Sequence, residues 1–106
     1  MPTSYKEAYR ILLNCQEKLN AQDIASLPRD KQITLLKAQQ SVYLEIQHLQ
    51  TQRMTARTDP FVALTADFQT SEEGFREIQQ WAAEARQTSE TITGLLKGLS
   101  LVLGLF

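Results

Sequence analysis

Apolar side chains recur every three or four positions along this chain, which is the spacing of one face of an α-helix. In the first such stretch, about residues 5–20, these positions are Tyr5, Ala8, Leu12, Cys15 and Leu19. In the second, about residues 28–56, they are Leu35, Val42, Ile46 and Leu49, with Ile33, Leu36 and Tyr43 widening the face. Since no stretch alternates apolar and polar residues between turn signals, we expect an all-α fold without a sheet.

The third stretch, residues 60–106, keeps one alternation of three and four over about six heptads. Its positions are Phe61, Leu64, Phe68, Ser71, Phe75, Ile78, Ala82, Ala85, Ser89, Ile92, Leu96, Leu99, Leu103 and Phe106. Such a long pattern is typical of coiled-coil contact, and it predicts one continuous helix of roughly 70 Å. The alternative is a break near residue 70, where Thr70 and Glu73 match a capping box ahead of Gly74.

Capping residues mark the expected start of each helix. Ser4 and Glu7 match a capping box, Pro28 stands in a first turn, and Asp59 is a candidate N-cap with Pro60 at the first helical position. The prediction is one domain, residues 1–106, formed as an elongated helical hairpin or three-helix bundle. Its helices are expected at about 5–20, 28–56 and 60–106.

The tail, residues 92–106, is the most apolar part of the chain, and Lys97 is its only charged side chain. As a helix it would be about 22 Å long, too short to cross a hydrocarbon core of roughly 30 Å. The spacing of Gly94 and Gly98 allows two helix backbones to approach closely, and we expect this crossing to lie between assembled chains. The candidate interaction residues are Gly94, Leu95, Gly98, Leu99, Leu101, Val102, Leu103, Leu105, Phe106 and, from the preceding segment, Trp81.

Charge is distributed unevenly along the chain, although the net charge is only -1. Residues 1–58 carry eight basic and five acidic side chains, and residues 59–106 carry three and seven. Opposite charges favour packing of one half on the other, or contact between copies, over binding to nucleic acid. The polar N-terminal residues lack the apolar run of a secretory signal, so we expect a cytoplasmic protein, membrane-associated if the tail meets lipid.

Candidate catalytic or metal chemistry is sparse. Glu45 and His48 have the Glu-x-x-His spacing of di-iron bundles, but one such pair per chain needs a symmetric copy, with Glu17 as a conceivable extra ligand. A solvated helix face is the preferred interpretation of this pair. Cys15, the single cysteine, lies on an apolar stripe and is interpreted as core filler. We therefore expect no enzyme, no cofactor and no metal site.

These patterns favour an assembly or interaction subunit that oligomerises, or docks on another helical protein, through its apolar C-terminal helix. One alternative is a small membrane-active protein that forms pores or lies on lipid through residues 92–106. The other is a soluble regulator of a protein partner, similar in role to an immunity protein or a chaperone.

Overall fold

The computed structural model describes residues 3–85 and 89–106, and these residues form helices and connecting segments without a β-strand. The elements are α1 (Tyr5–Asn20), the 3₁₀-helix η1 (Ile24–Ser26), α2 (Arg29–Thr51), α3 (Ala66–Gln69), α4 (Glu72–Glu84) and α5 (Glu90–Leu103). The predicted all-α class is confirmed.

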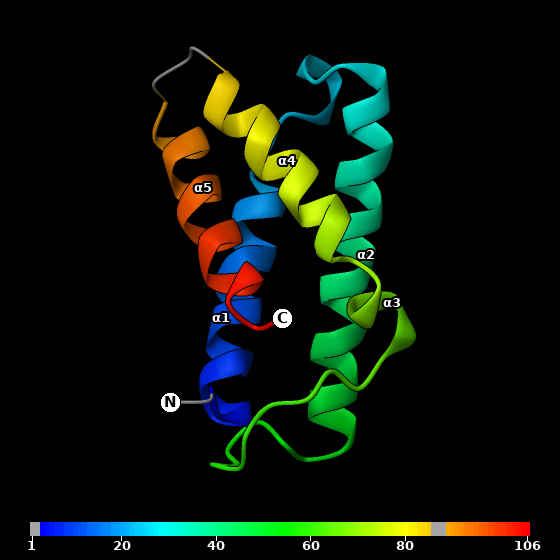
Figure 1. The fold of residues 1–106 in the computed structure, drawn as a ribbon, viewed down its shortest axis with the longest axis vertical. Coiled ribbons are helices and arrows are strands. Elements are labelled where there is room, and N and C mark those ends of the chain that lie inside the picture. Colours follow the sequence, from blue (N-terminus) through cyan, green and yellow to red (C-terminus); the bar gives the residue numbers. More distant parts are fainter. Residues whose placement is uncertain (1–2, 86–88) are drawn as a thin grey trace.

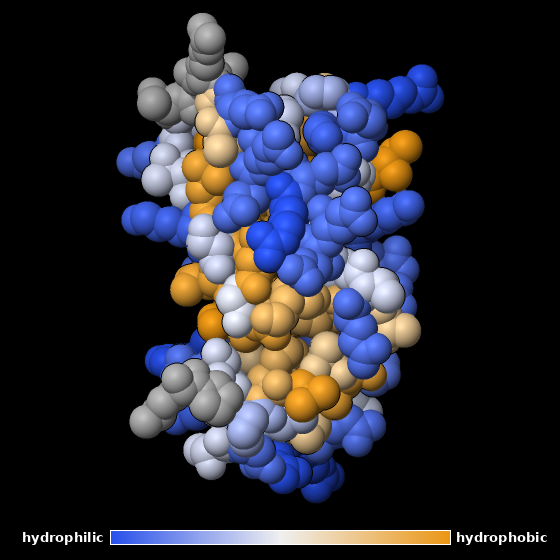
Figure 2. All heavy atoms as spheres, viewed as in Figure 1, coloured by the Kyte–Doolittle hydropathy of each residue, from blue (hydrophilic) through white to orange (hydrophobic). Residues whose placement is uncertain are grey.

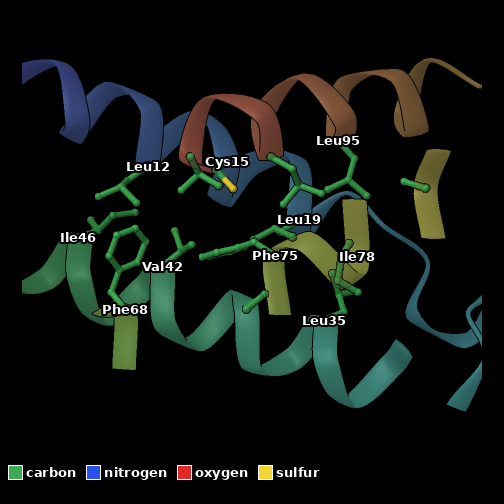
Figure 3. Close-up of a cluster of buried hydrophobic side chains, with 14 of the residues drawn as sticks. Leu12, Cys15, Leu19, Leu35, Val42, Ile46, Phe68, Phe75, Ile78 and Leu95 are labelled. Atoms are coloured by element: carbon green, nitrogen blue, oxygen red, sulfur yellow. The ribbon is translucent and has the colours of Figure 1, made fainter. Parts of the chain in front are cut away.

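The four longer helices of the described residues run alternately up and down the molecule in the order α1, α2, α4, α5 (Figure 1). Both α1 and α4 pack against α2 and α5, so the four helices close around a shared core. Figure 3 shows this core, to which every one of the four helices and α3 contributes buried side chains. The helices thus enclose one continuous apolar interior.

The first two helices begin where their capping residues predict. The hydroxyl of Ser4 accepts a hydrogen bond from the backbone N–H of Glu7 at 3.2 Å, which satisfies one free donor of the first turn of α1. Helix α2 begins directly after Pro28. It ends at Thr51 rather than at the predicted residue 56, because Arg53 adopts a left-handed backbone conformation with φ of 57°.

The predicted single helix over residues 60–106 is wrong. It would measure roughly 70 Å, whereas the longest extent of the described residues is 39 Å. The segment contains α3, α4 and α5, with interruptions before Ala66, at Thr70 and Ser71, and after Glu84. The elongated shape is wrong for the same reason, since three short helices fold back where one long helix would project.

Hydroxyl side chains explain two of the three new helix starts. The hydroxyl of Thr65 accepts a hydrogen bond from the N–H of Phe68 at 3.1 Å, and that of Ser89 accepts from the N–H of Ile92 at 3.2 Å. The alternative break near residue 70 is present, but the hydroxyl of Thr70 donates back to α3 rather than capping α4. Local capping, rather than the continuous apolar stripe, therefore decides where these helices begin.

Asp59 and Pro60 do not begin a helix, contrary to prediction. They lie in the connection between α2 and α3, which passes the N-terminal end of α1. The carbonyls of Asp59 and Arg57 accept hydrogen bonds from the N–H groups of Tyr5 and Lys6 at 3.0 and 2.9 Å. These are donors of the first helical turn that have no partner inside the helix, so the connection completes the start of α1.

A buried carboxylate fixes the end of the same connection. Glu45, on the inner face of α2, is fully buried. Its oxygens accept hydrogen bonds from the N–H of Leu64 at 2.7 Å, the N–H of Thr65 at 2.9 Å and the hydroxyl of Thr65 at 2.8 Å. Three donors replace the water that the carboxylate has lost, which makes its burial tolerable.

We predict that Glu45→Gln lowers the free energy of unfolding by about 1 to 3 kcal/mol, because the amide NH₂ replaces one of the two carboxylate oxygens and cannot accept from the N–H group that it faces. Urea denaturation at neutral pH measures this change. Glu73→Gln is the matched control, since Glu73 is exposed on α4, and it should alter stability by less than about 0.5 kcal/mol. Equal midpoints for the two variants would contradict the assigned role of Glu45.

Candidate interaction surface

Much of the predicted interaction surface of α5 lies inside the protein's own core. Leu95, Leu99 and Val102 are fully buried, and Gly98 is buried as well. They face inward because α5 packs against both α1 and α4. These four residues are thus unavailable to a partner in the folded chain, which corrects their assignment from sequence.

The two glycines mark a helix crossing within the chain. A Cβ atom placed on Gly98 would lie 3.5 Å from the backbone Cα of Cys15 and 3.5 Å from the side chain of Lys18. One placed on Gly94 would lie 3.2 Å from the side chain of Lys18. Close helix approach is therefore present as the spacing predicts, but its partner is α1 of the same chain rather than an assembled copy.

The surface part of the tail begins at the last turn of α5. Leu101 and Phe106 are 51% and 42% exposed, whereas Leu103 and Leu105 are partly buried and pack on the edge of the core. The Phe106 ring stacks on Phe68 with 5.0 Å between ring centroids. The end of the chain is thereby held against the bundle with apolar surface still open to solvent.

The connection before α3 adds apolar surface next to the tail. The ring of Phe61 meets Phe68, on which Phe106 stacks, edge to face at 6.2 Å between centroids. Val62 is 65% exposed, the largest exposed fraction among the large apolar residues described. Figure 2 shows hydrophobic atoms gathered over α5, the C-terminus and this connection. We call this surface the C-terminal patch; it comprises Phe61, Val62, Leu64, Leu96, Leu101, Leu103, Leu105 and Phe106.

Trp81 is not part of the C-terminal patch. It is partly buried near the end of α4, packs against the core and lines a hollow of about 390 Å³ with Gln22 and Ile92. Gln22 spans this region, since its side-chain amide donates to the carbonyls of Lys18 and Thr91 at 3.0 and 3.4 Å. The predicted interaction residues are therefore divided between two places, and Trp81 lies beside the first turn of α5 rather than its last.

The pair of Glu45 and His48 does not form a metal site. Glu45 is engaged with the connection before α3, while His48 is exposed and its Nδ1 lies 3.2 Å from the carbonyl of Leu44. Glu17 is exposed beside Lys18. Residues 3–85 and 89–106 contain no group of three or more His, Cys, Asp or Glu side chains placed to hold a metal ion. The solvated-face interpretation is correct for His48 and wrong for Glu45.

Cys15 is core filler, as its position on the apolar stripe of α1 predicts. Its side chain is fully buried, and burial raises the pKa of the thiol to about 12. The thiolate is the nucleophilic form of cysteine, so the thiol is unreactive at neutral pH in the folded chain.

An open groove of about 670 Å³ lies between α2, α3 and α4. Its charged lining includes Lys37 from α2 and Glu73 and Glu77 from α4. Glu77 is held by Lys31 at 3.3 Å and by the hydroxyl of Thr34 at 3.2 Å. The contact joins the basic half of the chain to the acidic half, so this carboxylate has a structural partner.

The outer face of α2 was missed as a surface by the sequence analysis. Ile33, Leu36 and Tyr43, which were predicted to widen the core-facing stripe, are about half exposed. The core-facing stripe of α2 contains Leu35, Ala38, Val42 and Leu49 instead. The signal was present, because Leu36 and Tyr43 each follow a core residue of α2 by one position, and one position turns a side chain about 100° around the helix.

Comparison with protein-family models, with curated proteins and with solved structures finds no match to this chain. Within the described ranges, no helix combines the length and the hydropathy needed to cross a membrane.

The α1–α5 crossing generates a prediction about Gly98. Gly98→Ala should leave stability unchanged or raise it by up to about 1 kcal/mol, because its Cβ would make ordinary van der Waals contacts and alanine favours the helix. Gly98→Leu should lower the free energy of unfolding by about 1 to 3 kcal/mol through overpacking against α1.

Urea denaturation of the monomeric fraction measures both effects. Thr93→Leu is the matched control, since it adds a leucine at an exposed position of the same helix. If Gly98→Leu weakened only assembly and left the free energy of unfolding unchanged, Gly98 would lie at a crossing between chains rather than at the α1–α5 crossing.

Proposed function

We propose that this chain is a non-enzymatic assembly subunit that uses the C-terminal patch to bind a second copy of itself or another helical protein. The observation that carries the proposal is the exposed apolar surface at the end of α5 and in the connection before α3, where Leu101, Phe106 and Val62 are each 42% to 65% exposed and Figure 2 shows hydrophobic atoms gathered. Apolar groups gathered on one face are typical of interaction sites, whereas scattered ones need no explanation.

The size of the patch limits the kind of contact. Covering the open halves of Val62, Leu101 and Phe106 would contribute about 2 to 4 kcal/mol. Association costs an estimated 4 kcal/mol or more in lost translational and rotational freedom, so these three side chains alone do not sustain a complex. A partner must also cover the partly buried residues of the patch, as a helix laid along α5 would do.

The buried half of α5 supports this proposal. Leu95, Leu99 and Val102 fix the helix in the core, so the outer side chains are presented on a rigid platform and lose little backbone freedom on binding. Lys97 lies exposed beside Leu101 and gives the patch a positively charged rim. The same rim suits the alternative in which the patch rests on an anionic lipid surface.

We expect Leu101→Glu to reduce the average mass in multi-angle light scattering at high protein concentration, while the helical circular dichroism signal is retained. The new carboxylate would have to be desolvated in the contact, but it is readily solvated in the free chain. Ile33→Glu, at a half-exposed position on α2, is the control and should assemble as the unmodified chain does.

Liposome flotation separates the lipid alternative from protein assembly. Flotation of the unmodified chain that is lost in Leu101→Glu, without any change of mass, would favour the membrane-active function. A single-chain mass at all concentrations, together with no flotation, would leave only docking on a different protein. If a partner protein then co-purified equally well with Leu101→Glu and with the control Ile33→Glu, the C-terminal patch would not be its binding site.

A further inference from the structure

The hollow beside Trp81 lies at the end of the bundle where α4 ends and α5 begins (Figure 1). Its volume is about 390 Å³, and its lining also comes from the end of α1 and from η1. Among the described residues, this lining contains one acidic side chain, Asp23, and no basic one. The hollow therefore differs from the groove between α2 and α4, where Lys37 accompanies the acids.

Gln22 presents a fixed hydrogen-bond acceptor at this hollow. The residue is only 9% exposed, and its Nε2 donates to the carbonyls of Lys18 and Thr91 at 3.0 and 3.4 Å. Because both partners are acceptors, the amide cannot be turned around, and Oε1 has to lie on its other side. Oε1 accepts no hydrogen bond from the described residues, and none of their unpartnered side-chain polar atoms is buried. Oε1 is therefore accessible from the hollow that Gln22 lines.

The carboxylate of Asp23 is a second acceptor. Asp23 precedes η1, but its side chain does not cap that helix and forms no ion pair with the described residues. The hydroxyl of Ser26 donates to the backbone carbonyl of Asp23 at 2.7 Å and leaves the carboxylate unengaged. Lys18 does not neutralise it, because its Nζ lies 3.8 Å from Glu17 and its stem lies along Gly94. The carboxylate is thus available to a cation.

The helix ends at the hollow also favour a cation. Ala21 and Ala85, the C-cap residues of α1 and α4, both line it, so two helices bring their partially negative carbonyl ends there. Helix α5 brings its partially positive end. There, however, the hydroxyl of Ser89 accepts from one free N–H, and Glu90 lies in the first turn. Two carbonyl ends and a carboxylate outweigh this one amide end.

Trp81 adds an aromatic ring to the same hollow. It is partly buried and packs against the core, which holds the indole in place. A cation beside an indole ring is attracted by the negative charge of the ring face. A guanidinium group suits these partners best, because it is planar, is weakly hydrated and carries several N–H donors in a fixed arrangement. An ammonium group has no flat face, and a quaternary ammonium has no N–H to donate to Gln22.

We propose that this hollow binds a guanidinium group, with its face on Trp81 and its N–H groups donating to the carboxylate of Asp23 and to Oε1 of Gln22. Such a group is carried by an arginine side chain of another protein or by a small free compound. The site is separate from the C-terminal patch and does not depend on the proposed assembly function.

Trp81 is the chain's only tryptophan, so its fluorescence reports binding directly. The probe is arginine blocked at both ends, titrated into the full chain at constant ionic strength. We expect a saturable change of the emission. The citrulline derivative has the same shape without the charge and should bind at least about tenfold more weakly, and the lysine derivative should bind about threefold more weakly. Calorimetry provides a second readout.

A short flexible peptide with a central arginine distinguishes the two sources of the group. Binding of this peptide at least about tenfold tighter than blocked arginine would assign the guanidinium to a protein partner, because contacts beyond the hollow would contribute. Equal affinity would assign it to a small compound.

Variants place the probe on the molecule. Asp23→Asn should weaken binding of blocked arginine about fivefold or more, through the loss of the charge. Asp67→Asn is the matched control, since Asp67 is exposed on α3 outside the hollow, and it should not change the affinity. Leu101→Glu should also leave it unchanged, which separates this site from the C-terminal patch. Circular dichroism checks that each variant is folded.

Four results would overturn the proposal. They are no binding by fluorescence or calorimetry, equal affinity for the arginine and citrulline derivatives, equal affinity in Asp23→Asn and the unmodified chain, and binding that appears only in Arg86→Gln. Arg86 follows Ala85 in the sequence. Binding that required its removal would assign the hollow to an arginine of the chain itself, whereas the proposal expects the same affinity in Arg86→Gln.

Discussion

The buried carboxylate of Glu45 determines where the second half of the bundle begins. By accepting hydrogen bonds from Leu64 and Thr65, it ties the connection after α2 back to the inner face of α2. Thr65, held there, caps α3 and so places Phe68 in the core. Phe75 on α4 and the end of the chain then pack around Phe68. One charged group thus sets the register of the later helices on the earlier ones.

The helical class and the two N-terminal helices were predictable from sequence because local rules decide them. The stripe of α1 and the hydroxyl of Ser4 define the same helix in the sequence and in the structure. The break of the third stretch was not predictable from its spacing, because a common core imposes the same phase on separate helices. The decisive contact, between Glu45 and Thr65, joins residues 20 positions apart, and no local pattern encodes it.

The candidate surface, like the fold, was predictable from sequence only in part. Sequence identified the apolar tail, but its inner side, including Leu95 and Leu99, belongs to the core. Burial of a side chain depends on which helix packs against it, and the approach of α1 to Gly98 could not be distinguished from the approach of another chain. Val62 was missed because a single valine in a connection has no periodic pattern. On α2, Ile33, Leu36 and Tyr43 could have been separated from the core stripe by their helical positions, but the assumption that all apolar residues are core assigned them to it.

The place of Cys15 gives the molecule an internal reporter. It is the single cysteine of the chain, its side chain is fully buried, and its backbone lies at the point where α5 crosses α1. A thiol reagent therefore reaches the sulfur only when the core around it opens, either locally, as when α5 moves away from α1, or by unfolding of the whole bundle. The rate of labelling under native conditions measures how often the packing around Cys15 opens. Comparison with the rate of global unfolding distinguishes a terminal helix that detaches by itself from one that unfolds only with the rest of the bundle.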